Sequence, residues 1–176
     1  MKKLSMDELN RLSVQDFQLT HKNPFVFVLD DIRSLNNVGS IFRTADAFKA
    51  EKVYLCGITG TPPHRDITKT ALGAEDSVAW QHAPNAADLV QQLKTEGYQI
   101  AAIEQVTGST MLHNFCPQEN KKYAFVLGNE VFGVSEAVIT ACDVCLEIPQ
   151  FGTKHSLNVA VSAGIVAWEF VKNKLL

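Results

Sequence analysis

Continuous apolar runs alternate along this chain with segments whose apolar residues recur at helical spacing. A short apolar run bounded by turn residues is typical of a strand buried on both faces of a parallel sheet. The pattern predicts strands at residues 24–29, 52–58, 78–81, 98–106, 122–127 and 144–148. Helical spacing predicts helices at about 5–19, 36–49, 67–72, 84–96, 135–141 and 157–174. Strands that alternate with helices favour an α/β fold with a mainly parallel sheet and helices on both of its faces.

The length of 176 residues fits one domain with a short arm. We assign residues 1–23 to an N-terminal helical arm, opened by the capping-box spacing of Ser5 and Glu8, and residues 24–176 to the main domain. The N-terminus lacks the apolar core of a signal peptide, and no apolar run is long enough to cross a bilayer. We therefore expect a cytoplasmic protein with no membrane partner.

Charge and known motifs narrow the possible chemistry. The net charge of −3 does not favour nucleic-acid binding, although a whole-chain sum can hide a basic face. The sequence contains no P-loop, no G-x-G-x-x-G after its first strand, no G-x-S-x-G and no His cluster with metal-ligand spacing. We expect no metal site, and we expect the four cysteines to be buried, reduced thiols.

Ligands of parallel α/β sheets bind beyond the carboxyl ends of the strands. After the first strand, Asp30 and Asp31 lead into a helix on which Asn36, Ser40 and Arg43 share one polar side. Amides, a hydroxyl and a guanidinium near a helix N-terminus suit a phosphate or a sugar. An ordinary helix cap and a solvated arginine are the simpler interpretation, and it is the stronger one from these residues alone.

Two further strand ends carry polar residues. After residues 122–127, Gly128 permits close approach of the backbone to a ligand, and the carboxylate of Glu130 beside a buried strand end requires a partner. After residues 144–148, a Pro-Gln-Phe-Gly loop precedes Ser156, which is placed to cap the last helix. That helix is apolar around most of its circumference, which suggests an oligomer interface.

Three segments taken together resemble one known family. N-N-V-G-S-I-F-R-T-A-D-A-F at 36–48, F-V-L-G-N-E-V-F-G-V-S at 125–135 and I-P-Q-F-G-T-K-H-S-L-N-V-A-V-S-A-G at 148–164 are similar, in this order, to the three motifs of the SpoU (TrmH-like) RNA ribose 2′-O-methyltransferases of the SPOUT superfamily. The resemblance covers about residues 24–172 and includes K-T-A-L-G-A at 69–74.

The resemblance implies a SPOUT-type sheet with a C-terminal trefoil knot that binds S-adenosylmethionine, largely through backbone groups. Motif matching assigns the cofactor site to Ile103, Leu127, Gly128, Asn129, Ile148, Pro149, Ser156 and Leu157. It assigns the catalytic positions to Asn37, Arg43, Glu130, Ser156 and Asn158. It further implies a homodimer formed through the C-terminal helix, with tRNA or rRNA as the partner.

The implied reaction is transfer of the cofactor's methyl group to a ribose 2′-oxygen. The family view makes Arg43 the proton acceptor, but the very high pKa of a guanidinium favours binding of phosphate and stabilisation of the developing alkoxide. Asn37 and Asn158 are expected to hold the ribose or Arg43, and Glu130 to orient Arg43 or a neighbouring donor. The alternatives are a non-catalytic RNA-binding or assembly factor on the same fold, and a small-molecule enzyme on an unknotted sheet.

Overall fold

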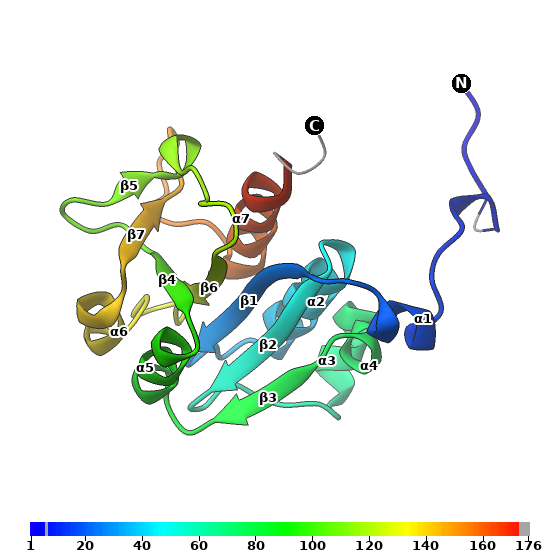
Figure 1. Ribbon diagram of the computed structural model, residues 1–176, viewed down its shortest axis with the longest axis horizontal. Helices are drawn as coiled ribbons and strands as arrows, with labels where there is room; N and C mark the ends of the chain where they lie inside the picture. The colour runs from blue at the N-terminus through cyan, green and yellow to red at the C-terminus, as the bar shows by residue number, and fades with distance from the viewer. Residues whose placement is uncertain (6, 173–176) are drawn as a thin grey trace.

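A parallel sheet forms the centre of the protein, whose computed structural model describes residues 1–5 and 7–172. Its strands are β1 (Asn23–Asp30), β2 (Ala50–Cys56), β3 (Trp80–Ala83), β4 (Tyr98–Ile103), β5 (Thr110–Met111), β6 (Lys122–Leu127) and β7 (Val144–Glu147). They lie in the order β3-β2-β1-β6-β4-β7-β5, and every neighbouring pair is parallel (Figure 1). All the carboxyl ends therefore meet at one edge, as the alternating sequence pattern predicts.

Helices cover both faces of the sheet. They are α1 (Val14–Leu19), α2 (Leu35–Ala47), α3 (Arg65–Ala71), α4 (Ala74–Ser77), α5 (Ala86–Thr95), α6 (Glu136–Ala141) and α7 (Val159–Lys172). The core on one face contains residues of α2, α3, α4 and α7, and the core on the other face contains residues of α5 and α6. This confirms the α/β class with two covered faces; the trefoil knot stays a prediction from the resemblance.

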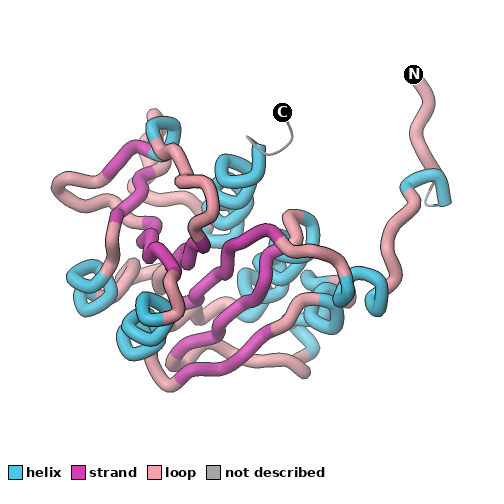
Figure 2. Tube along the Cα trace, viewed as in Figure 1, coloured by secondary structure: helices cyan, strands magenta, loops and turns pink. Residues whose placement is uncertain are grey.

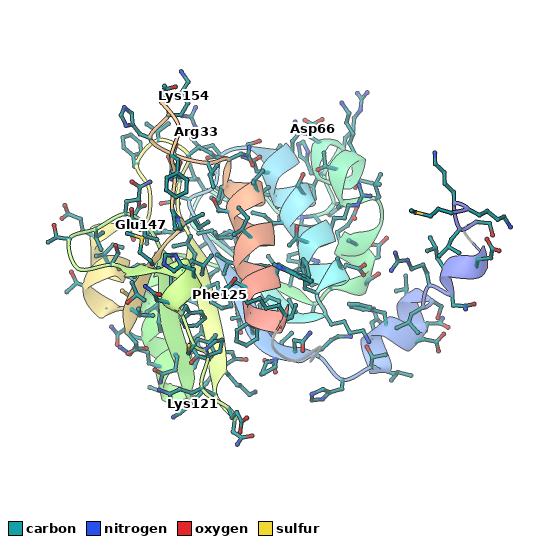
Figure 3. All side chains as sticks on the ribbon, turned by 90° about the horizontal axis from the view of Figure 1, so that it is seen from above. Arg33, Asp66, Lys121, Phe125, Glu147 and Lys154 are labelled. Carbon is teal, nitrogen blue, oxygen red and sulfur yellow. The ribbon has the colours of Figure 1, made fainter. Side chains whose placement is uncertain are left out.

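An aromatic cluster fixes α7 against the sheet. The ring of Phe170 lies 5.3 Å from that of Phe25 and 5.5 Å from that of Phe125, in edge-on geometry. Such pairs add to the large apolar area that each ring buries. Helix α7 also packs beside α2 (Figure 3), so the segments at 36–48 and 148–164 are brought together although they are far apart in the sequence.

The predicted N-terminal helix is wrong in its extent. The capping box forms, because the Ser5 amide donates to Glu8 Oε2 at 2.7 Å and the Glu8 amide donates to Ser5 Oγ at 3.3 Å. It supports only a 3₁₀ turn, η1 (Asp7–Leu9), because Asn10 takes a left-handed conformation with φ of 46°. Helix α1 starts afresh with Ser13 as its N-cap, and the preceding arm projects away from the body (Figure 2).

Other boundaries shift by a few residues. The third strand starts at Trp80, β4 ends at Ile103, and α7 begins at Val159 instead of residue 157. The pattern did not predict α4, β5 or the 3₁₀ turn η2 (Leu112–Asn114), which are each two to four residues long. Elements this short are too small to generate a recognisable period.

Candidate active site

A cavity of about 940 Å³ opens beyond the carboxyl ends of β4, β6 and β7. We call it the main cavity. Its apolar walls come from the ends of three neighbouring strands and from the start of α7: Ile103, Leu127, Leu146, Ile148 and Val159. Its polar lining includes the backbone after β6 and the loop before α7. An apolar pocket with a few polar groups at this edge of a parallel sheet is the usual form of a small-molecule site.

Gly128 allows the loop after β6 to fold tightly. A Cβ atom on this residue would lie 2.1 Å from both the carbonyl carbon of Gly133 and the amide nitrogen of Val134. The sequence suggested that Gly128 lets the backbone approach a ligand closely. In the structure, Gly128 lets its own backbone approach that of Gly133 and Val134. It shapes the wall of the main cavity, which Leu127, Gly128 and Asn129 line as a continuous stretch.

The side chain of Asn129 holds this wall in place. It is buried, and its Nδ2 donates to the carbonyl oxygen of Asp31 at 2.7 Å. Its Oδ1 accepts from the amides of Val131 at 2.9 Å and Phe132 at 3.2 Å. The Asn129 backbone is paired as well, because its amide donates to the Gly133 carbonyl oxygen at 3.0 Å and its carbonyl oxygen accepts from the Gly133 amide at 2.9 Å. Asn129 therefore shapes the wall of the main cavity through structural contacts.

Glu130 joins the loop after β6 to the N-terminus of α2. Its carboxylate accepts hydrogen bonds from the amides of Arg33 at 2.9 Å and Ser34 at 3.0 Å, and from Asn37 Nδ2 at 2.9 Å. Burial alone would raise the pKa of this carboxyl, but the hydrogen bonds from Arg33, Asn37 and Ser34 outweigh burial and lower it. Glu130 therefore carries a negative charge at neutral pH, beside the positive end of the α2 dipole.

Asn158 extends this network to the third motif. Its Nδ2 donates to Asn37 Oδ1 at 3.0 Å, which forms a chain from Glu130 through Asn37 to Asn158. Its Oδ1 accepts from the amides of Ala160 at 2.9 Å and Val161 at 3.4 Å, so Asn158 caps α7. The expectation that Ser156 caps a helix starting at residue 157 is wrong, because the cap lies two residues further on.

Residues of the loop before α7 differ in their relation to the main cavity. Ile148, Ser156 and Leu157 line it, whereas Pro149 does not. The exposed Ser156 hydroxyl has no hydrogen-bond partner within the part of the chain that the structure describes. His155 also lines the cavity, and its carbonyl oxygen accepts from Gln105 Nε2 at 2.9 Å.

Arg43 lies apart from the other motif residues. Its exposed side chain lines a separate hollow of about 480 Å³, together with Ser40, Thr44, Ala47, Phe48, Lys69 and Thr70. Glu130 was expected to orient either Arg43 or a neighbouring donor. Its hydrogen bonds go to Asn37 and to two backbone amides, so the neighbouring donor is Asn37. Within one chain, the structure does not bring Arg43 into the main cavity.

Several cavity residues were missed by sequence reasoning. Glu104 and Gln105 line the main cavity directly after β4, and Glu104 Oε2 accepts from the Val134 amide at 2.9 Å. Extending the predicted strand to residue 106 concealed this strand end, although an Ile-Glu-Gln sequence after an apolar run was the available signal. Phe132 was also missed; it is 85% exposed and lines the same cavity.

The cysteines and acidic residues supply no further site. Cys142 and Cys145 are half-buried with their sulfur atoms 3.4 Å apart, and burial, followed by the hydrogen bond with Cys142, raises the pKa of Cys145 to about 12. Cys116 is exposed, which contradicts the expectation that all four thiols are buried. Among residues 1–5 and 7–172, no group of three or more His, Cys, Asp or Glu side chains could hold a metal ion.

Fold and site together define an α/β domain with a ligand cavity at its strand ends. A polar chain runs from Glu130 through Asn37 to Asn158, and Glu130 and Asn158 line this cavity. Residues 24–168 match the SpoU rRNA Methylase family, and the chain belongs to that family. In the described segments, no helix combines the length and apolar character needed to cross a bilayer.

Named relatives support this assignment. The chain is 32% identical to the 23S rRNA (guanosine-2′-O-)-methyltransferase RlmB of Neisseria meningitidis serogroup B, over 87% of its own length and 60% of the relative. It is 28% identical to RlmB of Vibrio vulnificus, over 96% of its own length and 67% of that relative. The chain thus spans about three fifths to two thirds of the length of these relatives.

Solved structures show the same fold. An AdoMet-bound rRNA methyltransferase from Sinorhizobium meliloti superimposes with a TM-score of 0.80 at 26% identity, over 89% of this chain and 60% of that one. The A. aeolicus TrmH/SpoU tRNA modifying enzyme superimposes with a TM-score of 0.81 at 23% identity, over 92% of this chain and 81% of that one.

Proposed function

We propose that this protein is an S-adenosylmethionine-dependent methyltransferase that modifies a ribose 2′-hydroxyl of rRNA or tRNA in the cytoplasm. The observation that carries the proposal is the main cavity, which gathers the second and third family motifs around one space at the strand ends. The RNA substrate classes are those that the names of its relatives print.

The residues present fit this cofactor. Apolar side chains of Ile103, Leu127 and Ile148 can enclose the adenine ring, and backbone groups at Gly128 and Leu157 can hydrogen-bond to it and to the ribose. Asn129 shapes this wall through its pairing with Gly133. Pro149 restricts the backbone of the loop that carries Ile148. When bound, the cofactor supplies an electrophilic methyl group on a sulfonium.

The chain's own side chains hold and activate the hydroxyl. Ser156 and Asn158 line the main cavity, where the Ser156 hydroxyl and the Asn158 amide can orient a ribose. Glu130 fixes Asn37, and Asn37 fixes Asn158, so this part of the cavity lining is preorganised before RNA binds. The Arg43 guanidinium stays protonated, so its role is to bind a phosphate and to stabilise the developing negative charge on the 2′-oxygen.

A homodimer through α7 completes the site in this proposal. Val161, Ile165 and Trp168 form an exposed apolar stripe at helical spacing. The Trp168 ring lies 6.5 Å from that of Phe48, which lines the Arg43 hollow. A second copy seated on this stripe lies beside Arg43, so Arg43 of one protomer can serve the main cavity of the other.

Calorimetry tests the cofactor first. We expect S-adenosylmethionine to bind, and a protein that does not bind it is not a methyltransferase. Arg43→Ala should abolish methyl transfer while preserving cofactor binding; full activity in this variant rules out the assigned role. Mapping 2′-O-methylation in RNA from cells with and without the gene then identifies the target nucleotide. An unchanged methylation map, with cofactor binding intact, favours the non-catalytic RNA-binding alternative.

A further inference from the structure

A second cavity lies next to the main cavity at the same edge of the sheet. We call this cavity of about 420 Å³ the side cavity; its lining includes Asp30, Asp31, Arg33, Ile58, Phe132 and Ser135. Three residues of the loop after β6 line both cavities, which are therefore adjacent: Asn129, Phe132 and Gly133. Figure 3 shows Arg33 at this edge, on the opposite side of the molecule from Lys121, which precedes β6.

The walls of the side cavity are held by hydrogen bonds between the loops after β1, β2 and β6. Asp31 Oδ1 accepts from the Ile58 amide at 2.9 Å, and Asp30 Oδ2 accepts from the Ser135 amide at 2.9 Å. Thr59 Oγ1 accepts from the Ile32 amide at 2.9 Å behind the same wall. The cavity is therefore formed before any ligand binds, which reduces the entropy lost on binding.

Its lining combines three kinds of chemistry. The Phe132 ring is 85% exposed and Ile58 is 68% exposed, so two apolar surfaces can contact a flat ligand. Asp30 is only 5% exposed, and its Oδ1 accepts no hydrogen bond from the residues that the structure describes. The exposed Arg33 side chain adds a positive charge at the mouth.

These features match a nucleobase that presents adjacent hydrogen-bond donors. Unstacked RNA bases are recognised by stacking on aromatic side chains and by hydrogen bonds to their Watson–Crick edges. Guanine carries two neighbouring donors, N1–H and the N2 amine, which a carboxylate can accept together. Uracil presents a single donor, N3–H, between two carbonyl oxygens, and these oxygens repel the same carboxylates.

We propose that the side cavity receives the guanine base of the nucleotide that is methylated, with its ribose directed toward the main cavity. The base stacks on Phe132, its donor edge faces Asp30 and Asp31, and Arg33 contacts a phosphate. This inference rests on the proposed function, because it supplies the base specificity of the same reaction.

Nucleotide binding to the full-length protein tests the side cavity directly. With saturating S-adenosylmethionine in the main cavity, guanosine 5′-monophosphate is titrated while backbone NMR shifts are recorded. We expect shifts at Ile58, Arg33 and Phe132. Inosine 5′-monophosphate lacks the N2 amine and should bind about tenfold more weakly, and uridine 5′-monophosphate more weakly still. Equal binding of uridine monophosphate, shifts confined to residues 148–158, or no binding at millimolar concentration overturns the proposal.

Variants separate stacking in the cavity from general contact with RNA. Phe132→Ala should weaken guanosine monophosphate about tenfold, within the range for loss of one base–aromatic stack, and Phe132→Tyr should restore it. Phe151→Ala is the matched control, because Phe151 is also a highly exposed phenylalanine but lies outside the side cavity. Equal losses in the Phe132 and Phe151 variants contradict the proposal. Cofactor binding is measured separately, so its failure counts against the methyltransferase and not against the base pocket.

Discussion

Glu130 is a short link between two motifs that lie far apart in the sequence. Its carboxylate accepts three hydrogen bonds, from two backbone amides and from Asn37. Glu130→Gln replaces one acceptor oxygen with a donor that faces donors. We expect a loss of about 1 kcal/mol in the free energy of unfolding, at the low end for such bonds because the carboxylate is exposed to solvent. Urea unfolding at neutral pH measures it.

The effect of Glu130→Gln on the free energy of unfolding should also depend on pH. The pKa of Glu130 in the folded protein is below its ordinary value of 4.5, so its charge stabilises the fold above that value. As the pH falls through 4.5 and then through the folded pKa, this contribution is lost. The stability difference between wild type and Glu130→Gln should therefore narrow in acid. A difference that stays constant from neutral to acidic pH contradicts this assignment of the charge.

Gly128 and Gly152 form a matched pair at the same edge of the sheet. A Cβ on Gly128 meets backbone atoms at 2.1 Å, whereas a Cβ on Gly152 meets nothing within 4 Å. We expect Gly128→Ala to cost about 1–3 kcal/mol and to abolish cofactor binding by displacing the wall of the main cavity. Gly152→Ala should change neither thermal unfolding nor calorimetric affinity. Normal cofactor binding by a well-folded Gly128→Ala protein shows that this wall is not part of the site.

At the scale of the elements, Asn158 both caps α7 and forms the last link of the polar chain from Glu130 through Asn37. Asn158→Ala removes both contacts and should destabilise the protein by about 1 kcal/mol, as the loss of a helix cap does. Asn158→Asp keeps an acceptor for the amides of Ala160 and Val161 but cannot donate to Asn37. We expect this variant to retain most of the stability and to lose methyl-transfer activity. Comparing melting temperature with activity for the two variants separates the cap from the link.

Much of this arrangement was predictable at the element level. Buried strands gave continuous apolar runs, and parallel strands place their carboxyl ends together, so the meeting of the loops after β1, β6 and β7 followed from the pattern. The cap at Asn158 was misplaced by two residues, because Ser156 is an equally good capping residue and periodicity does not distinguish them. The prediction of one helix over residues 5–19 was wrong, because a capping box alone supplies no packing for the turn that it opens.

The position of Arg43 was the part of the candidate site that could not be predicted from the sequence. The helical wheel placed Arg43 beside Ser40, and both do line one hollow. The wheel does not show which cavity that side of α2 faces, because this depends on how α2 packs against α3 and α7. Likewise, Phe132 has no periodic signal, since it lies in a loop whose shape is set by the side chain of Asn129.

At the scale of the whole molecule, the exposed stripe on α7 predicts a dimer. Trp168 is 52% exposed and Val161 is 51% exposed on a helix whose other side is buried in the core. Trp168→Lys places a charge in the centre of the proposed interface and should give a folded monomer by sedimentation velocity. Leu72→Lys is the control, because Leu72 is 66% exposed but lies at the C-terminal end of α3, outside the stripe on α7. A wild-type protein that is monomeric at micromolar concentration contradicts the interface.

Shared active sites make a sharper prediction than the dimer itself. If Arg43 of one protomer serves the main cavity of the other, Arg43→Ala and Gly128→Ala homodimers are both inactive, because each lacks one half of every site. In a mixed dimer, the cavity of the Arg43→Ala protomer meets the intact Arg43 of its partner, so one site of the two is complete. Purified mixed dimers, isolated by two different tags, should therefore show about half of the wild-type activity. Inactive mixed dimers that still bind cofactor in one protomer mean that Arg43 acts within its own chain.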